Sequence, residues 1–455
     1  MLEKLSEYLS QIDADYSDIR YEKMVTTKMG YNKDELALVN SSATDGYVIR
    51  VLIDGGFASI AVTSPDDITR AITKVCDNAR ILGKEMEKPI QLKFGPVVVE
   101  NVPLELDGDP RTTPITEKLA LTKQYNDLVL SQPNVQTTTT GYNEVFRNKY
   151  FVSSRGTRIH EPIITTSLGC RIVCKKGEIV QSTHARVGGS EGFNKLLNRE
   201  DFFLERAKIA NQLLDAPPVK GGTYNVVLDS SMAGVFTHEA FGHFSEADLI
   251  ENSPSMLEKM QVGTQLGSEI VDIIDDATAR QQVGYYKYDD EGVAVKPVTL
   301  MEKGVLKGRL HSMRTAHAFD DQLTGHTISE DSRYEPIIRM GCIYIKPKND
   351  SVEDLIKKAK NGLYVLGAKG GQTSGENFTF GAQYAFYIED GKIGPMVRDI
   401  NIMGNLFDTL KNISAISDSV ELSEAGGCGK GQLNIKSCHG GPHILINNIL
   451  VGGVQ

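Results

Sequence analysis

Apolar and polar positions change period several times along the first 220 residues, which predicts a mixture of helices and strands there. Two strand-like runs, 46–53 and 57–62, flank the turn residues Asp54-Gly55-Gly56 and indicate a β-hairpin. A short amphipathic helix within residues 1 to about 20 is predicted by apolar residues at helical spacing, namely Leu2, Leu5, Leu9 and Ile12.

The rest of this half continues the alternation of helices and strands. Helical spacing returns at 64–82, at 116–129 and at 199–214. Between the last two, residues 136–187 alternate as a meander of strands with Gly-containing turns. Residues 215–222 then combine two Pro with two Gly and interrupt every pattern, so we place the main domain boundary there.

Beyond this break the pattern is mostly strand-like around one helix. Residues 224–228 are typical of a buried strand, and Asp229 is placed to cap a helix that runs through Phe236. The prediction is an α+β protein, with an N-terminal α+β domain over 1–220 followed by a β-rich C-terminal domain over 221–455.

Two acidic segments of the C-terminal half are interpreted locally. Residues 268–276 predict a strand with an acidic end. Asp289, Asp290 and Glu291 precede Gly292 and predict a solvated turn.

Composition narrows the class of protein. The formal net charge of −10 over 455 residues, with no dense basic run, argues against general nucleic-acid binding. No apolar run reaches the length of a membrane span, and the first residues lack the basic and then apolar order of a signal peptide, so we expect a cytoplasmic protein. The six cysteines are sparse and scattered, which favours reduced thiols or a ligand over a disulfide framework.

The central chemical motif is His238-Glu239-Ala240-Phe241-Gly242-His243, or H-E-x-x-x-H. Metal hydrolases commonly place two His at i and i+4, with a Glu after the first as general base. Here the spacing is i and i+5, which diverges by roughly 140° on a regular α-helix. The two His can share a metal only if the helix takes in an extra residue as a π-bulge, which Gly242 is compatible with. We therefore predict a π-type widening between Thr237 and Phe244; the alternative is two helical histidines with no joint purpose.

Other candidate residues stay open at this stage. Cys438, His439 and His443 lie close together, but the Gly-Gly-Pro between the two His prevents a helix from setting them on one face. The segment 426–432 resembles a phosphate loop but lacks the Ser or Thr after its Gly-Lys, and no helix follows. Three further histidines without metal spacing are interpreted as polar or substrate-side residues: His311, His317 and His326.

Taken together, these motifs resemble the family of TldD and PmbA (TldE), once called modulators of DNA gyrase. The resemblance covers nearly the whole chain. The segments that carry it are Leu228 to Val235 running into the His-Glu motif, Glu246-Ala247-Asp248, Asp289 to Gly292, and Cys428-Gly429-Lys430-Gly431-Gln432.

The resemblance implies a zinc-dependent protease that acts on peptides or unfolded segments. Carried over to this sequence, it implies that His238, His243 and Cys428 are metal ligands and that Glu239 is the general base on a zinc-bound water. It also implies a two-subunit particle, with a PmbA-type partner or as a homodimer. The rival hypothesis is a non-enzymatic modulator that binds a protein partner and carries a structural zinc, for which a carboxylate base has no use.

Overall fold

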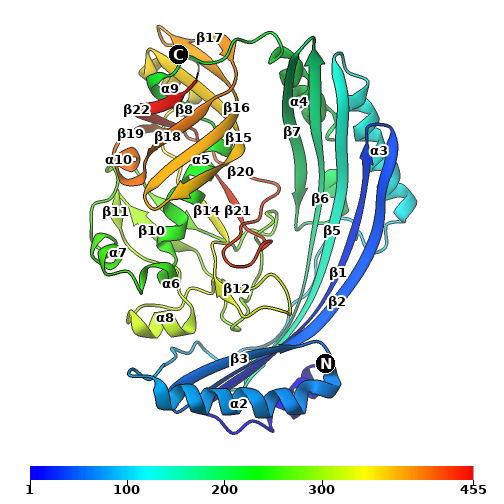
Figure 1. Ribbon diagram of the computed structural model, residues 1–455, viewed down its shortest axis with the longest axis vertical. Helices are drawn as coiled ribbons and strands as arrows, with labels where there is room; N and C mark the ends of the chain where they lie inside the picture. The colour runs from blue at the N-terminus through cyan, green and yellow to red at the C-terminus, as the bar shows by residue number, and fades with distance from the viewer. Residues whose placement is uncertain (454–455) are drawn as a thin grey trace.

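The protein, described over residues 1–453 in a computed structural model, has the predicted α+β fold. Figure 1 shows a long, curved sheet along one side of the molecule. A second body of strands and helices, formed by the C-terminal half, lies on the concave side of that sheet (Figure 1).

The curved sheet belongs to the N-terminal half. Its strand order is β3-β2-β1-β5-β6-β4, with β7 paired to β6. Neighbouring strands are antiparallel, apart from the parallel pair β4 and β6. The strands are β1 (Tyr16–Asn32), β2 (Glu35–Ile53), β3 (Gly56–Val62), β4 (Val99–Asn101), β5 (Val135–Ser153), β6 (Arg158–Lys176) and β7 (Ile179–Gly189).

Two helical layers cover two ends of this sheet. Helices α1 (Leu2–Leu9) and α2 (Ile68–Glu85) share one apolar core with β1, β2 and β3. Helices α3 (Ile115–Leu130) and α4 (Glu200–Gln212) share another with β5, β6 and β7. The strands are long enough to span both cores, which makes the sheet the frame of this half. Two short 3₁₀ turns precede helices in this half, η1 (Pro65–Asp67) and η2 (Phe193–Leu196).

Turn residues and apolar spacing in the sequence predict where most of these elements begin and end. The predicted hairpin is confirmed as β2 and β3, with Asp54 and Gly55 at φ of 50° and 79°, as a two-residue turn requires. The opening helix ends at Leu9, three residues before Ile12, and β1 starts at Tyr16.

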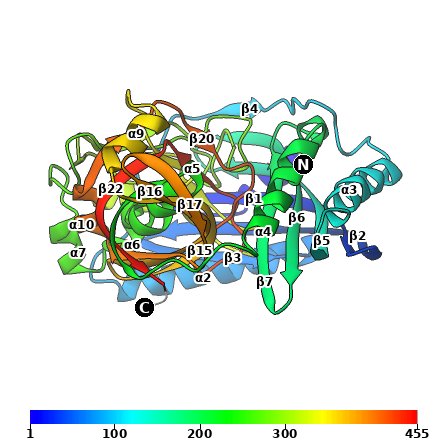
Figure 2. The same cartoon turned by 90° about the horizontal axis from the view of Figure 1, so that it is seen from above.

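In the C-terminal half, one sheet closes on itself. Strand β15 pairs with β8, β8 with β22, β22 with β18, β18 with β16, and β16 again with β15. In Figure 2 these strands curve around α5. The strands of this sheet are β8 (Gly222–Leu228), β15 (Gly362–Ser374), β16 (Asn377–Glu389), β17 (Lys392–Val397), β18 (Asn401–Asn405), β19 (Ile413–Ile416) and β22 (Ile444–Gly452).

A six-stranded sheet in the order β11-β10-β9-β14-β21-β20 and the pair β12–β13 complete this half. The expected strand over 268–276 is confined to β9, because the residues before Ile273 form turns. The strands are β9 (Ile273–Asp275), β10 (Val298–Glu302), β11 (Val305–Leu306), β12 (Thr327–Ile328), β13 (Ile337–Ile338), β14 (Cys342–Ile345), β20 (Glu421–Leu422) and β21 (Cys438–Gly441).

The helices of this half are short. Met232, Phe236 and Phe241 on the motif helix are buried in the core that the closed sheet shares with its neighbours, so this helix lies inside the domain. The helices are α5 (Ser230–Val235), η3 (Phe236–Phe241), η4 (Gly242–Ser245), α6 (Ala247–Ile250), α7 (Pro254–Lys259), α8 (Met313–Ala318), α9 (Val352–Ala359) and α10 (Leu406–Lys411).

The interpretation of residues 289–291 as a solvated turn is wrong. Asp289 and Asp290 are each 1% exposed and Glu291 is 7% exposed. Glu291 pairs with Arg50 of β2 at 2.8 Å. Asp290 pairs with three cations from the curved sheet: Arg20, Arg147 and Lys149. These ion pairs join the two halves of the molecule, and their partners lie too far away in the sequence for a local pattern to indicate them.

None of the helices within residues 1–453 combines the length and apolar character needed to cross a membrane.

Candidate metal centre

The motif helix starts from a rigid platform. Strand β8 is buried at its C-terminal end and leads directly into Asp229. One carboxylate oxygen of Asp229 accepts a hydrogen bond from Met232 N at 2.8 Å, the predicted N-cap, and the other accepts one from Gly367 N at 2.8 Å. Burial raises the pKa of Asp229 to about 6. The helix that carries the histidines is therefore fixed to both β8 and β15 at its first turn.

The predicted widening of the helix is confirmed. After α5 the chain continues as a π-helix over Phe236–Phe241 and ends in the 3₁₀ turn Gly242–Ser245. The i→i+5 bonding of a π-helix brings residues five apart towards one face. The ring centroids of His238 and His243 are accordingly 5.5 Å apart.

The reason for a glycine in this motif differs from the one expected. Gly242 has ordinary helical angles, φ −57° and ψ −44°, so it is not needed for backbone freedom. A Cβ atom at this position would lie 2.0 Å from Sδ of Met340. Gly242 therefore serves the close packing of the motif helix against the neighbouring core.

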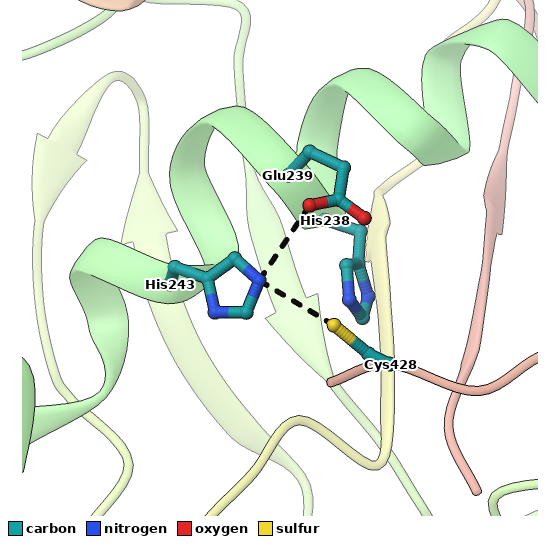
Figure 3. A group of neighbouring side chains, drawn as sticks. All are labelled: His238, Glu239, His243 and Cys428. Atoms are coloured by element: carbon teal, nitrogen blue, oxygen red, sulfur yellow. Dashed lines mark hydrogen bonds and ion pairs between the residues drawn. The ribbon is translucent and has the colours of Figure 1, made fainter. Parts of the chain in front are cut away.

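Four candidate residues meet at one point. Each of His238, Glu239, His243 and Cys428 offers a ligand atom, and these atoms all lie within 4.8 Å of one another. Figure 3 shows the Glu239 carboxylate and the Cys428 thiol both facing the same nitrogen of the His243 ring. Nε2 of His243 lies 3.5 Å from Sγ of Cys428 and 3.6 Å from Oε2 of Glu239. Cys428 comes from a Gly-rich loop far along the chain, whereas the other three come from the motif helix.

The His238 ring fits a metal ligand. It is 2% exposed, and neither ring nitrogen has a hydrogen-bond partner among the residues described. Burial, followed by the positive potential of His439 and His243, lowers its pKa well below the usual value. A buried, neutral imidazole with a free nitrogen lone pair is the form in which His binds metals.

The contacts of the His243 ring favour a positive charge within this cluster. Burial alone would lower the pKa of its ring. Its contacts with Cys428, Glu239 and Glu246 outweigh burial and raise that pKa to about 11. A divalent cation at the same point would satisfy these donors and displace the proton.

The competing candidates lie outside this group of four. His439 is nearest, with its ring centroid 5.6 Å from that of His238. Cys438 Sγ contacts the Ser423 carbonyl at 3.3 Å. His443 Nε2 lies 3.0 Å from Oη of Tyr364.

The three histidines of the middle segment also serve other contacts or lie elsewhere. His326 Nε2 lies 3.0 Å from the buried carboxylate of Asp275, and His311 Nδ1 lies 3.2 Å from Oγ1 of Thr315. His317 belongs to the last turn of α8. The sequence interpretation of these residues as non-ligands agrees with their positions.

Three family models of known proteins match successive parts of the chain. Residues 221–453 match the PmbA/TldA metallopeptidase C-terminal domain, 108–215 match the central domain, and 17–80 match domain 1. The chain belongs to the PmbA/TldA metallopeptidase family. The predicted family is thereby confirmed.

Relatives of similar length support the enzyme class. A metalloprotease of Synechocystis is 32% identical, over 99% of this chain and 97% of that protein. A metalloprotease of Methanocaldococcus jannaschii is 34% identical, over 97% of each chain. A protein of Saccharolobus solfataricus named as a zinc metalloprotease TldD homologue is 28% identical, over 97% of this chain and 98% of its own. The predicted class of metalloprotease is confirmed by these relatives, and one of them names zinc as the metal.

Solved structures share the fold of this chain at low sequence identity. A Thermotoga maritima protein described as a modulator of a DNA gyrase has a TM-score of 0.81 at 19% identity, covering 99% of this chain and 100% of that one. TldE from Thermococcus kodakarensis has a TM-score of 0.74 at 18% identity, covering 99% of each chain.

Proposed function

We propose that this chain is a zinc-dependent protease that cleaves unfolded or extended peptide segments. His238, His243 and Cys428 hold the zinc, and Glu239 is the general base. The observation that carries the proposal is the convergence of these four side chains from a π-helix and a distant loop. Nitrogen and thiolate donors favour zinc over magnesium or calcium, and three protein ligands leave one coordination position open for catalysis.

Each side chain of the centre has its own role in the proposed reaction. When bound, zinc supplies a Lewis acid that acidifies water and polarises a peptide carbonyl. The Glu239 side chain is 33% exposed, so its carboxylate can reach both solvent and substrate. Its carboxylate oxygen accepts the proton of the attacking water and transfers it to the leaving amine. The buried His238 and the His243 ring hold the metal beside that carboxylate.

The proposal that the substrate is an extended peptide rests on the β-rich surroundings of the metal centre. An extended peptide binds to a sheet edge through backbone hydrogen bonds, which are tolerant of sequence. The centre is open on the side of Glu239 and His243 and closed on the side of His238, which is 2% exposed. An extended peptide can enter such a one-sided opening. A stably folded protein offers no extended segment that could enter it.

The assembly and location complete the proposal. A dimer with a PmbA-type (TldE) subunit, or a homodimer, is supported by the full-length structural likeness to TldE of Thermococcus kodakarensis. All six cysteines are buried free thiols, which suits a reducing compartment and supports the cytoplasm. A domain boundary at residue 220 is supported by the Pro-containing segment between α4 and β8.

The decisive experiment compares Glu239→Gln with the wild type. Both proteins are loaded with zinc and incubated with unstructured peptides, alone and with a PmbA-type subunit, and the products are analysed by mass. We expect Glu239→Gln to keep its zinc and its partner and to lose cleavage by about 10²–10⁴-fold. Glu258→Gln, at an exposed position of α7, is the matched control and keeps full activity. Zinc binding without any cleavage by the wild type would favour the modulator with a structural zinc.

A further inference from the structure

A buried carboxylate behind the metal centre has no role in the mechanism above. Glu246 follows the motif helix directly and is 0% exposed. Its Oε2 atom lies 3.3 Å from Nδ1 of His243 and 3.0 Å from Nζ of Lys430. Its Oε1 atom faces Nε of the fully buried Arg339 at 3.9 Å. A carboxylate in this position is held ionised by its neighbours and contacts a candidate ligand on the side away from the metal.

The contact between Glu246 and His243 determines which ring nitrogen of His243 is free to bind a metal. A neutral imidazole carries its proton on one nitrogen and a lone pair on the other. Because a carboxylate accepts at Nδ1, that nitrogen carries the proton when the ring binds a metal. The lone pair of Nε2 then points to the side of Cys428 Sγ and Glu239, where the metal is proposed.

The same carboxylate also reaches the loop that carries Cys428. Lys430 lies two residues after Cys428. Its ammonium lies within hydrogen-bond distance of four oxygens: Glu246 Oε2 at 3.0 Å, Asp248 Oδ1 at 2.9 Å, Asp248 Oδ2 at 3.0 Å and the Ile338 carbonyl at 2.8 Å. Other hydrogen bonds hold the loop to different parts of the chain, such as Cys428 N to the Ile435 carbonyl and Gln432 Nε2 to the Glu335 carbonyl. Glycines flank Lys430 on both sides, and Gly431 has a φ of +72°, so the Lys430 side chain supplies the link from this flexible stretch to Glu246.

We propose that Glu246 and Lys430 form a positioning pair that sets two metal ligands at once. Glu246 orients the His243 ring, and Lys430 ties the Cys428 loop to the same carboxylate. The inference rests on the proposed metal site, but it assigns to these two residues a task that the ligands themselves do not perform. The pair links the loop of Cys428 directly to the segment that follows the motif helix, although Cys428 and His243 are 185 positions apart in the chain.

The test uses metal binding as its readout. The metal-free full chain is titrated with Zn²⁺ against a chromophoric chelator, and with Co²⁺ to record the thiolate-to-cobalt absorption band. For Glu246→Gln we expect zinc affinity to fall at least about tenfold, the range found for partners of metal-bound histidines. For Lys430→Met we expect the thiolate band to weaken or disappear, and Lys430→Arg, which keeps the charge, to restore part of it.

The matched control is Glu251→Gln. Glu251 forms a partly buried ion pair with Arg314, but neither residue contacts His243 or Lys430. This variant should bind both metals as the wild type does. Apo-protein circular dichroism and melting midpoints check folding, and Glu246→Asp, which keeps the charge on a shorter side chain, replaces Glu246→Gln if that variant does not fold.

The outcomes separate this inference from the proposed function. Cys428→Ser is measured in parallel, and it should lose the thiolate band. If Cys428→Ser loses the band while the variants of Glu246 and Lys430 bind both metals like the wild type, the positioning pair is wrong and the ligand set stands. If Cys428→Ser retains the band, the ligand set of the proposed function is wrong.

Discussion

Sγ of Cys428 lies 3.5 Å from Nε2 of His243, although 185 positions separate the two residues in the chain. A thiol and an imidazole at this separation can bind one metal between them, because typical zinc bonds to sulfur and nitrogen are about 2.3 Å and 2.0–2.1 Å long. The contact therefore supports Cys428, among the six cysteines, as the ligand that we propose.

A comparison of two cysteines tests that choice. We expect Cys428→Ser to lose most of its zinc and its peptidase activity. Cys438→Ser should stay near the wild type in both, since its thiol contacts the Ser423 carbonyl and lies outside the group of four. Zinc content by atomic spectroscopy and peptide cleavage are measured on both proteins. The reverse pattern would move the third ligand to Cys438.

Zinc affinity should fall as the pH falls. In the metal-free protein the pKa of His243 is raised to about 11, so the ring carries a proton across the physiological range. Zinc must displace that proton, and each displaced proton costs about tenfold in apparent affinity per pH unit. Isothermal titration in buffers of different ionisation enthalpy measures the released protons. Affinity that is constant from pH 6 to pH 8 would contradict a protonated His243.

Gly242→Ala should destabilise the protein through crowding. The added methyl group would meet Sδ of Met340 at 2.0 Å, and overpacking of this kind costs about 1–3 kcal/mol in the free energy of unfolding. Urea unfolding of Gly242→Ala, Met340→Ala and the double variant forms the necessary cycle. The cost of Gly242→Ala should shrink when Met340 is already Ala. An equal cost in both backgrounds would assign the effect to the backbone instead.

Asp290→Asn should weaken the junction between the two halves. This carboxylate is buried against Arg20, Arg147 and Lys149, and removing one partner of a buried ion pair costs about 3–5 kcal/mol in the free energy of unfolding. Urea unfolding at pH 7 measures the loss. The control Asp77→Asn removes an exposed pair with Arg80 and should cost no more than about 1 kcal/mol.

For the same variant we predict that the stability difference from the wild type depends on pH. Burial would raise the pKa of Asp290, but the cations around it outweigh burial and hold the pKa well below the ordinary value of 3.8. A carboxyl whose pKa is lower in the folded state stabilises the protein fully above the unfolded-state pKa, and that contribution is lost as the pH falls towards the folded-state pKa. The stability difference between wild type and Asp290→Asn should therefore be constant from pH 5 to pH 7 and shrink below about pH 4. A difference that grows in acid would contradict this ion-pair assignment.

The sequence predicts the parts of the centre that depend on spacing within one segment. His238 and His243 are five positions apart, so they can share a metal only on a widened helix, and the π-helix is present. The packing reason for Gly242 could not be predicted from local pattern, because the atom that crowds this position belongs to Met340, almost a hundred positions away.

Burial of charge could not be predicted from local pattern. Asp289, Asp290 and Glu291 have the composition of an exposed turn, and only the curved sheet supplies the cations that make their burial favourable. The same holds for the contact between Glu246 and Lys430, since neither residue indicates the other in sequence. Closure of the sheet through β15 and β16 likewise depends on strand pairing, which periodicity does not specify.

The closed sheet also bears on when the candidate metal centre can assemble during synthesis. Leu228, the residue before the helix cap Asp229, pairs with Ile444 of β22, and β22 also pairs with β18. The platform of the motif helix is therefore incomplete until β22 has left the ribosome, and Cys428 emerges shortly before it. Such pairing over long sequence distances folds late. Between the synthesis of His243 and that of β22, the nascent chain therefore carries its two histidines and Glu239 without a complete platform, and we expect it to bind no metal at this site until β22 has been made.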